Sequence, residues 1–374
     1  MKIGIACYPT YGGSGVVATE LGLALAERGH QIHFLSYEPP LRLPSLPHLN
    51  GVTFHEVRVP PYPLFRYPPY ALALASKMVE VVQDTGVELL HVHYAIPHAV
   101  SAVLAKEMLG GGVKVVTTLH GTDVTLVGQD KSYLAPTRFG IERSDAVTAV
   151  SEHLRAQTDG FLCRNCTIHV IPNFIDTSRY NPERCSETRA RFAPRGEKVL
   201  MHVSNFRPVK RVGDVVRVFA AVQAETPARL LLVGDGPDLP AAEALAEELG
   251  VREHVEVLGQ QSSVERLLRA ADLFLLPSET ESFGLAALEA MACGVPPLVS
   301  DVGGLPEVVE DGVSGILCPV GDVGAMAARA LELMGDRKAH AAMASAARLR
   351  AVERFDRSIG VHAYESLYRE LLGA

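Results

Sequence analysis

Two glutamates separated by a short run of helix-forming residues form the part of this sequence best suited to chemistry. Glu281 and Glu289 are eight residues apart, and if only Glu289 lies inside a helix they are separated by about two turns. This separation is too large for two carboxylates that share a proton. It suits two contacts along one extended ligand, with Glu289 accepting from a vicinal diol such as ribose and Glu281 reaching the sugar or phosphate end. The alternative is that both are solvated charges, which is usual for glutamate.

A strand and a helix must position these two side chains. Residues 272–276 are a short apolar run typical of a buried parallel strand, ended by Pro277. A helix is predicted from Phe283, with apolar residues at intervals of three and a stop at Gly294. The first amides of such a helix are unpaired donors, so the turn at Ser282, Phe283 and Gly284 is predicted to bind a diphosphate.

The composition restricts the class of protein. With 374 residues the chain is long enough for two domains, and 48% apolar with 21% charged residues is typical of a globular protein. The sequence begins with a predicted strand instead of a signal peptide, which leads us to expect a cytoplasmic protein. A net charge of −8 does not support nucleic-acid binding, so a small ligand is expected.

Apolar runs alternate with helical patterns in two series, which predicts two parallel sheets and the α/β class. The first series has predicted strands at residues 2–7, 32–36, 52–59, 89–93, 113–119 and 146–151. The second series has predicted strands at residues 199–203, 229–233, 254–258 and 272–276. A polar connection separates the two series, so we expect domains at 1–170 and 171–355.

Polar residues stand at the ends of several predicted strands of the first series. His93 and Tyr94 stand at the end of the strand 89–93, and Thr118 and His120 at the end of the strand 113–119. Ligands bind at this edge of an open parallel sheet, which favours these residues over isolated polar ones. His120 is the best candidate, although a lone histidine more often bonds a backbone carbonyl. The glycine loop 11–15 lacks the dinucleotide fingerprint, but its helix start suits an anion near Gly13 and Ser14.

The region around the two glutamates resembles the donor-site signature of retaining GT-B glycosyltransferases of family 4. It contains, in order, a strand, Glu281, seven residues, Glu289, Cys-Gly-Val-Pro and Gly-Gly-Leu-Pro-Glu-Val. Residues 7–15, 91–99, 117–123 and 204–207 extend the resemblance over the whole chain. It implies a GT-B fold, in which two Rossmann-like domains with parallel sheets face a central cleft. The N-terminal domain would bind the acceptor and the C-terminal domain the nucleotide sugar, with helix 356–374 packing back on the first domain.

A departing nucleoside diphosphate gathers negative charge, which a metal ion or fixed cations must stabilise. The chain contains no Asp-x-Asp sequence, so we expect metal-independent transfer in which Arg207 and Lys210 take the part of the metal. Related transferases usually carry an arginine where this chain has Asn205, and Arg207 is expected to replace it. The resemblance also implies that Gly234 lines the donor cleft and that Leu258 offers backbone groups to the nucleobase. The alternative is a solvated run of charges.

The motifs are most similar to those of the branch that transfers N-acetylglucosamine from UDP-N-acetylglucosamine to the hydroxyl of L-malate, the first step of bacillithiol biosynthesis. This resemblance implies front-face attack with retention, with His120 positioning the sugar. It implies no cofactor, no stable membrane association and a homo-oligomer. An acceptor with two carboxylates needs several donors, for which we expect Ser14, Tyr94, Thr118 and either Arg138 or Arg66.

Alternatives remain, because the acceptor rests on resemblance and not on spacing. The chain could serve another acceptor, such as a glycolipid or a polyol phosphate. It could bind a sugar nucleotide without turnover, or it could be a sugar-nucleotide epimerase. Cys163 and Cys166 are favoured as a simple loop over a zinc or redox pair. The aromatic and basic segment 60–77 is favoured as a packed loop over one that touches a membrane or covers the acceptor.

Overall fold

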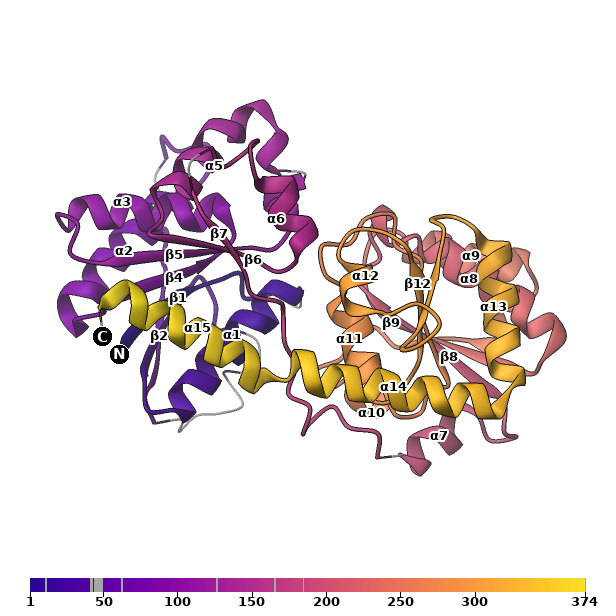
Figure 1. The fold of residues 1–374 in the computed structure, drawn as a ribbon. Coiled ribbons are helices and arrows are strands. Elements are labelled where there is room, and N and C mark those ends of the chain that lie inside the picture. Colours follow the sequence, from indigo (N-terminus) through magenta and orange to yellow (C-terminus); the bar gives the residue numbers. More distant parts are fainter. Residues whose placement is uncertain are drawn as a thin grey trace. The chain divides into compact units, whose positions relative to one another are not determined.

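The structure, a computed structural model, describes residues 1–373 except 11, 41, 42, 44–49, 62, 126, 165 and 184. Tyr11 of the predicted glycine loop and Tyr62 of the aromatic segment lie outside the described residues. The chain divides into two compact units, unit 1 with Met1–Asn173 and Arg357–Ala374, and unit 2 with Phe174–Asp356. Each unit is built around a parallel sheet that carries helices (Figure 1).

The sheet of unit 1 has the strand order β3-β2-β1-β4-β5-β6-β7, and all its described pairings are parallel. Its strands are β1 (Lys2–Ala6), β2 (Gln31–Ser36), β3 (Val52–Glu56), β4 (Leu89–His93), β5 (Lys114–Leu119), β6 (Ala146–Ala149) and β7 (Ile168–Val170). Its helices are α1 (Gly13–Glu27), α2 (Tyr70–Thr85), η2 (Ala95–Ala99), α3 (Val100–Met108), α4 (Thr122–Thr125), η3 (Val127–Gln129), α5 (Lys131–Arg143), α6 (Glu152–Thr158) and α15 (Arg357–Leu372).

The sheet of unit 2 has the order β10-β9-β8-β11-β12-β13 and is likewise parallel. Its strands are β8 (Lys198–Ser204), β9 (Ala228–Gly234), β10 (Val255–Val257), β11 (Leu273–Leu276), β12 (Pro297–Ser300) and β13 (Ile316–Cys318). Its helices are α7 (Ser186–Phe192), η4 (Pro208–Lys210), α8 (Val212–Glu225), α9 (Leu239–Glu248), η5 (Arg252–His254), α10 (Glu265–Leu268), α11 (Leu285–Ala292), α12 (Leu305–Val308), α13 (Val323–Gly335) and α14 (Arg337–Phe355).

Apolar residues at helical spacing fix the helices to their sheets. In α14 the buried residues recur every four positions, at Met343, Ala347, Ala351 and Phe355. This helix packs against α11. The last helix, α15, packs against α1 and buries Tyr364 and Tyr368 completely, which makes it part of unit 1. None of the described helices combines the length and the apolar character needed to cross a lipid bilayer.

Strand order reverses once in each sheet. From β1 the chain runs outward to β2 and β3, and it then crosses to the other side of β1 as β4. Unit 2 repeats this pattern with β8 and β11. In open parallel sheets, ligands bind beyond the carboxyl ends of the strands at such a switch point. Ser14 and Tyr94 follow β1 and β4, and Lys210 and Glu281 follow β8 and β11.

The predicted α/β class with two Rossmann-like sheets is confirmed, but two local expectations are wrong. The segment 60–77 is not a packed loop, because its second part is the start of α2 and its first part is exposed, with Leu64 at 81% and Tyr67 at 74%. The helix expected from Phe283 begins at Leu285, because Gly284 adopts a left-handed conformation. Several strands are also two or three residues shorter than their apolar runs.

Candidate active site

The loops that follow β8 and β11 meet in unit 2. The Lys210 ammonium lies 2.5 Å from Oε2 of Glu281, and both side chains are half-buried. The backbone N–H of Glu279 donates to the carbonyl oxygen of Val209 at 2.8 Å. The switch point therefore holds a cation and a carboxylate in contact.

The other basic residues of the β8 loop have different surroundings. Arg207 and Asn205 are exposed at the carboxyl end of β8. Arg211 has a left-handed backbone with φ 49°, and its guanidinium pairs with Asp214 of α8 at 2.6 Å. Asp214 thus neutralises Arg211, whereas Arg207 remains open to solvent for an anionic ligand.

Glycines let neighbouring turns pack directly on both loops. A Cβ on Gly303 would lie 1.9 Å from the carbonyl oxygen of Glu281, and a Cβ on Gly234 would lie 1.8 Å from that of Ser204. No side chain fits at such distances. The N–H of Gly304 also donates to the Glu281 carbonyl oxygen at 2.9 Å. The Gly-Gly-Leu-Pro motif therefore supports the Glu281 loop, and Gly234 supports the end of β8.

The predicted diphosphate position is an intact helix N-terminus. Gly284 caps α11 with φ 96°, and a Cβ there would also lie 2.4 Å from Leu305. Ser282 is half-buried, and Phe283 is buried with its ring edge against Phe355. The first-turn amides of α11 have no intrahelical acceptor, so they suit an anion.

Glu289 lies inside α11, while Glu281 lies in the loop before it. The hydroxyl of Tyr180 donates to Oε1 of Glu289 at 2.9 Å. Arg348 of α14 in turn donates to the carbonyl oxygen of Tyr180 at 2.6 Å. A residue far from the motif therefore orients this carboxylate. Leu258, after β10, is half-buried, and its carbonyl oxygen accepts from the side-chain amide of Gln261 at 2.5 Å. The second lone pair of that carbonyl oxygen can still accept from a nucleobase.

His202 of β8 is a residue that sequence reasoning missed. Its Nδ1 lies 2.8 Å from the carbonyl oxygen of Leu275, which can only accept, so Nδ1 carries the proton. Nε2 then accepts from the Ser204 hydroxyl at 2.8 Å, and Oγ of Ser204 accepts from the Phe206 N–H at 3.2 Å. Burial lowers the pKa of His202 to about 4. A neutral imidazole thus joins β8 to β11 and fixes the start of the Arg207 loop.

In unit 1, His120 is half-buried directly after β5. Its Nε2 lies 2.9 Å from Nδ1 of His93, and its ring stacks on Tyr94 with centroids 5.5 Å apart. Burial, together with His98, lowers the pKa of His120 to about 3. The ring is therefore neutral near pH 7, a state in which its nitrogens can form hydrogen bonds but carry no charge.

A buried carboxylate ties the ends of β4 and β5 together. Asp123 accepts from the backbone N–H groups of Gly121 at 2.8 Å, Ala95 at 3.1 Å and His120 at 3.2 Å. Burial raises the pKa of Asp123, while these hydrogen bonds lower it. Between these points Tyr94 has φ 86°, which is strained for a residue with a side chain. Asp123 is the last residue of the His-Gly-Thr-Asp motif, but the motif alone did not predict these hydrogen bonds.

Thr118 does not occupy the position expected of an acceptor-binding residue. It is fully buried, and its hydroxyl lies 2.7 Å from His91 Nε2, 2.7 Å from the Thr148 hydroxyl and 3.2 Å from the Tyr364 hydroxyl. A hydroxyl with three partners and no exposed surface has no capacity for a ligand in this arrangement. The side chain points into unit 1 because alternate residues of a strand face opposite sides.

The remaining candidates in unit 1 are Gly13, predicted for the donor, and Ser14, Arg138 and Arg66, predicted for the acceptor. Gly13 and Ser14 form the first turn of α1, where Gly13 is exposed and Ser14 half-buried. Arg138 lies on α5, which packs against the η2 turn after Tyr94, and its Nε donates to the carbonyl oxygen of Phe161 at 2.9 Å. The guanidinium of Arg138 also lies over the Phe161 ring at 5.3 Å, and Arg66 is exposed.

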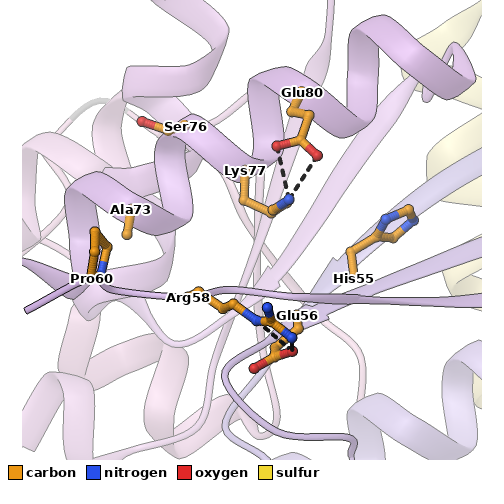
Figure 2. A pocket seen from close by; sticks show the side chains of 8 residues that line it. All are labelled: His55, Glu56, Arg58, Pro60, Ala73, Ser76, Lys77 and Glu80. Atoms are coloured by element: carbon orange, nitrogen blue, oxygen red, sulfur yellow. Dashed lines mark hydrogen bonds and ion pairs between the residues drawn. The ribbon is translucent and has the colours of Figure 1, made fainter.

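Two further features are separate from these groups. Cys163 and Cys166 are joined by a disulfide, so this segment is a cross-linked loop instead of the unpaired loop favoured from sequence. Beside β3 and α2 lies a hollow of about 670 Å³ (Figure 2). Its charged side chains pair with each other, Arg58 with Glu56 at 2.7 Å and Lys77 with Glu80 at 2.7 Å. The predicted site residues do not line this hollow, and we assign it no role.

Comparison with known proteins identifies relatives along the whole chain. Residues 11–179 match the family described as Glycosyltransferase Family 4, and residues 186–350 match Glycosyl transferases group 1. N-acetyl-alpha-D-glucosaminyl L-malate synthase from Bacillus anthracis is 49% identical over 100% of this chain and 97% of its own length. D-inositol 3-phosphate glycosyltransferase from Thermobispora bispora is 30% identical over 96% of this chain and 90% of its own length.

Solved structures share the fold. Sucrose-phosphate synthase from Thermosynechococcus elongatus superposes with a TM-score of 0.83 at 23% identity, covering 100% of this chain and 99% of that one. Anabaena HepE in complex with UDP-glucose superposes with a TM-score of 0.82 at 23% identity, covering 98% and 99%. Both are structural neighbours with the GT-B fold. With the full-length relative at 49% identity, this chain belongs to the family 4 glycosyltransferases.

Proposed function

We propose that this protein transfers N-acetylglucosamine from UDP-N-acetylglucosamine to the hydroxyl of L-malate with retention at the anomeric carbon. In this reaction the bond from the anomeric carbon to the phosphate oxygen breaks, and a bond to the malate hydroxyl oxygen forms on the same face. The departing phosphate takes the hydroxyl proton. The observation that carries the proposal is the full-length 49% identity to a relative named for this product.

Unit 2 would bind the donor. Lys210, Arg207 and the first amides of α11 would stabilise the charge that develops on the diphosphate, without a metal ion. Glu289, oriented by Tyr180, would accept from the ribose diol, while Glu281 would hold Lys210 and reach the sugar end. The supporting donor contacts would come from Asn205, Gly234, Leu258, Ser282, Phe283, Gly284 and, in unit 1, Gly13.

Unit 1 would bind the acceptor and orient the sugar. Ser14 at the start of α1, the hydroxyl of Tyr94 and the guanidinium of Arg138 would meet the malate carboxylates. Arg66 is the alternative to Arg138 for this cation. His120 would position the sugar through a ring nitrogen. Thr118 would stabilise the carboxyl end of β5 through its buried hydrogen bonds to His91, Thr148 and Tyr364. A homo-oligomer and a cytoplasmic location stay predictions.

Mass spectrometry of the purified protein tests this function. The protein is incubated with UDP-N-acetylglucosamine and a chelator, with and without L-malate. We expect N-acetylglucosaminyl-malate together with UDP, only when malate is present. UDP binding without this product would overturn the acceptor assignment, and product formation only without chelator would overturn metal independence. A His120→Ala protein with undiminished turnover would remove His120 from the mechanism.

A second candidate acceptor is a polyol phosphate. D-inositol 3-phosphate glycosyltransferases are 30% identical to this chain over most of its length. The same assay with inositol phosphate in place of malate distinguishes the two, because each acceptor gives a product of different mass. A higher kcat/KM with inositol phosphate would favour this second function.

A further inference from the structure

His93 lies between His120 and the interior of unit 1, and the mechanism above does not use it. It ends β4, its side chain is fully buried, and its Nδ1 lies 2.9 Å from Nε2 of His120. The ring centroids are 5.1 Å apart with 26° between the ring planes, so the two rings meet edge to edge through this hydrogen bond. A hydrogen bond between two neutral imidazoles contains one proton, so one ring must donate and the other accept.

The surroundings of His93 decide which ring donates. Its Nε2 is buried and has no hydrogen-bond partner among the described residues. A proton on this Nε2 would leave an orphaned N–H in the interior, which is rare in folded proteins. A proton on Nδ1 avoids this cost and makes His93 the donor to His120.

A neighbouring histidine shows that this interior accommodates a bare ring nitrogen. Nδ1 of His98 lies 2.6 Å from the carbonyl oxygen of His93. A carbonyl only accepts, so His98 carries its proton on Nδ1. Its Nε2 is therefore unprotonated, and it is also buried without a described partner. Burial lowers the pKa of both His93 and His98, so both rings are neutral near pH 7.

We propose that His93 is a positioning residue that sets the tautomer of His120. Because Nε2 of His120 accepts the proton of His93, a neutral His120 must carry its own proton on Nδ1, the other ring nitrogen. His120 then acts as a hydrogen-bond donor to an oxygen lone pair of the donor sugar, and not as an acceptor of a sugar hydroxyl proton. This inference rests on the proposed function, which assigns His120 to the sugar.

The ring of His120 has little freedom to escape this constraint. His93 holds one edge of it through the 2.9 Å hydrogen bond, and the Tyr94 ring lies beside it with centroids 5.5 Å apart. Its backbone N–H is held by the buried carboxylate of Asp123 at 3.2 Å. A rotation of the ring would break the bond to His93, so the tautomer and the ring orientation are set together.

Nitrogen-15 NMR of the full chain with labelled histidine tests the proposal, because it distinguishes the two neutral imidazole tautomers. The His120 signal is identified by its loss in His120→Gln. In the wild type we expect His120 protonated on Nδ1. His93→Asn places an amide nitrogen where Nδ1 was, and it should keep this tautomer. His93→Leu removes the donor, so the Nε2-protonated form should appear and kcat should fall about 10- to 100-fold.

The control variant is His33→Asn. His33 is also buried and also bonds another histidine, His55 at 2.9 Å, but it lies on β2. It should leave the His120 tautomer unchanged. A wild-type His120 protonated on Nε2 would overturn the inference even if His93→Leu fails to fold. The NMR result does not depend on turnover, so it stands or falls separately from the acceptor assignment.

Discussion

The two switch points of this protein have opposite chemical character. In unit 2 the edge is charged, with Lys210 and Glu281 in contact at 2.5 Å and glycines such as Gly303 packed against the loop backbone. In unit 1 the edge consists of neutral imidazole rings and hydroxyl groups around His93 and His120, above the buried Asp123. The difference matches two of the proposed tasks, which are stabilising a departing diphosphate in unit 2 and orienting a neutral sugar in unit 1.

The two edges also share a feature. The described non-glycine residues with positive φ are Tyr94 at 86°, Phe206 at 35° and Arg211 at 49°. All three lie in the turns after β4 and β8, the strands that border the switch points. Strained backbone persists only where its surroundings enforce it. Hydrogen bonds and an ion pair hold these turns. The N–H of Ala95, next to Tyr94, donates to Asp123, the N–H of Phe206 donates to the Ser204 hydroxyl oxygen, and Arg211 pairs with Asp214.

Loss of the charged edge should have the largest effect. Lys210→Met removes a cation from the proposed diphosphate site and leaves Glu281 unpaired, so kcat for transfer should fall about 100- to 1,000-fold. The measurement is product formation at saturating donor. Arg329→Met, at an exposed arginine of α13 paired with Glu332, is the control and should retain activity. Equal rates of product formation for both variants would contradict the proposed role of Lys210 at the diphosphate.

Disturbing the glycine that packs against the Glu281 loop should have the next largest effect, which is on UDP affinity. In Gly303→Ala the new Cβ would meet the Glu281 carbonyl oxygen at 1.9 Å, so the loop must move. Calorimetry with UDP should record an affinity about 10- to 100-fold weaker, equivalent to about 1.4 to 2.8 kcal/mol. Gly312→Ala is matched to it, since Gly312 also has positive φ but nothing within 4 Å of an added Cβ. If both variants bind UDP like the wild type, the glycine support is unnecessary.

The Glu289 carboxylate should contribute less than either. Glu289→Gln removes a charged acceptor but keeps the shape of the side chain and its contact to Tyr180. UDP affinity should weaken about tenfold, the range typical of a hydrogen bond to a charged group. Glu332→Gln on the exposed face of α13 provides the comparison and should bind UDP normally. Unchanged affinity in Glu289→Gln would remove the ribose assignment.

The smallest effect concerns stability below neutral pH. Burial lowers the pKa of His202 from 6.5 to about 4, so the unfolded chain takes up a proton between these values while the folded protein does not. Its contribution is complete above pH 6.5 and is lost by about 1 kcal/mol per pH unit as the pH falls toward 4. Chemical denaturation from pH 7 to pH 5 should show a shallower loss in His202→Asn than in the wild type. The exposed His169→Asn should follow the wild type, and a parallel slope in all three would refute this account.

Much of the fold could be read from local sequence. Apolar runs alternating with amphipathic stretches predict both parallel sheets, because a buried strand and a surface helix each have their own hydrophobic period. The motif around Glu281 and Glu289 was also recognisable, since its glycines occupy positions where a Cβ would clash. These features depend on neighbours in sequence or on close backbone contacts that only glycine permits.

The partners of individual side chains could not be read in this way. Thr118 ends a strand beside His120, yet it faces the interior and bonds to Tyr364, which is 246 residues away. Glu289 is held by Tyr180, and Cys163 is joined to Cys166, where sequence favoured a plain loop. Exposed aromatic residues at 64–67 were expected to pack.

The sequence by itself determined the two alternating series of strands and helices and the residues that follow each switch-point strand, but it did not predict β7, β12 and β13. The tertiary structure decided which of those residues face outward, which ones carry a proton and which ones serve only as support. The reason is physical: periodicity fixes an element and its buried face, but hydrogen-bond partners and burial depend on segments that meet only after folding. His93 illustrates this, because its proposed role exists only through its contact with His120.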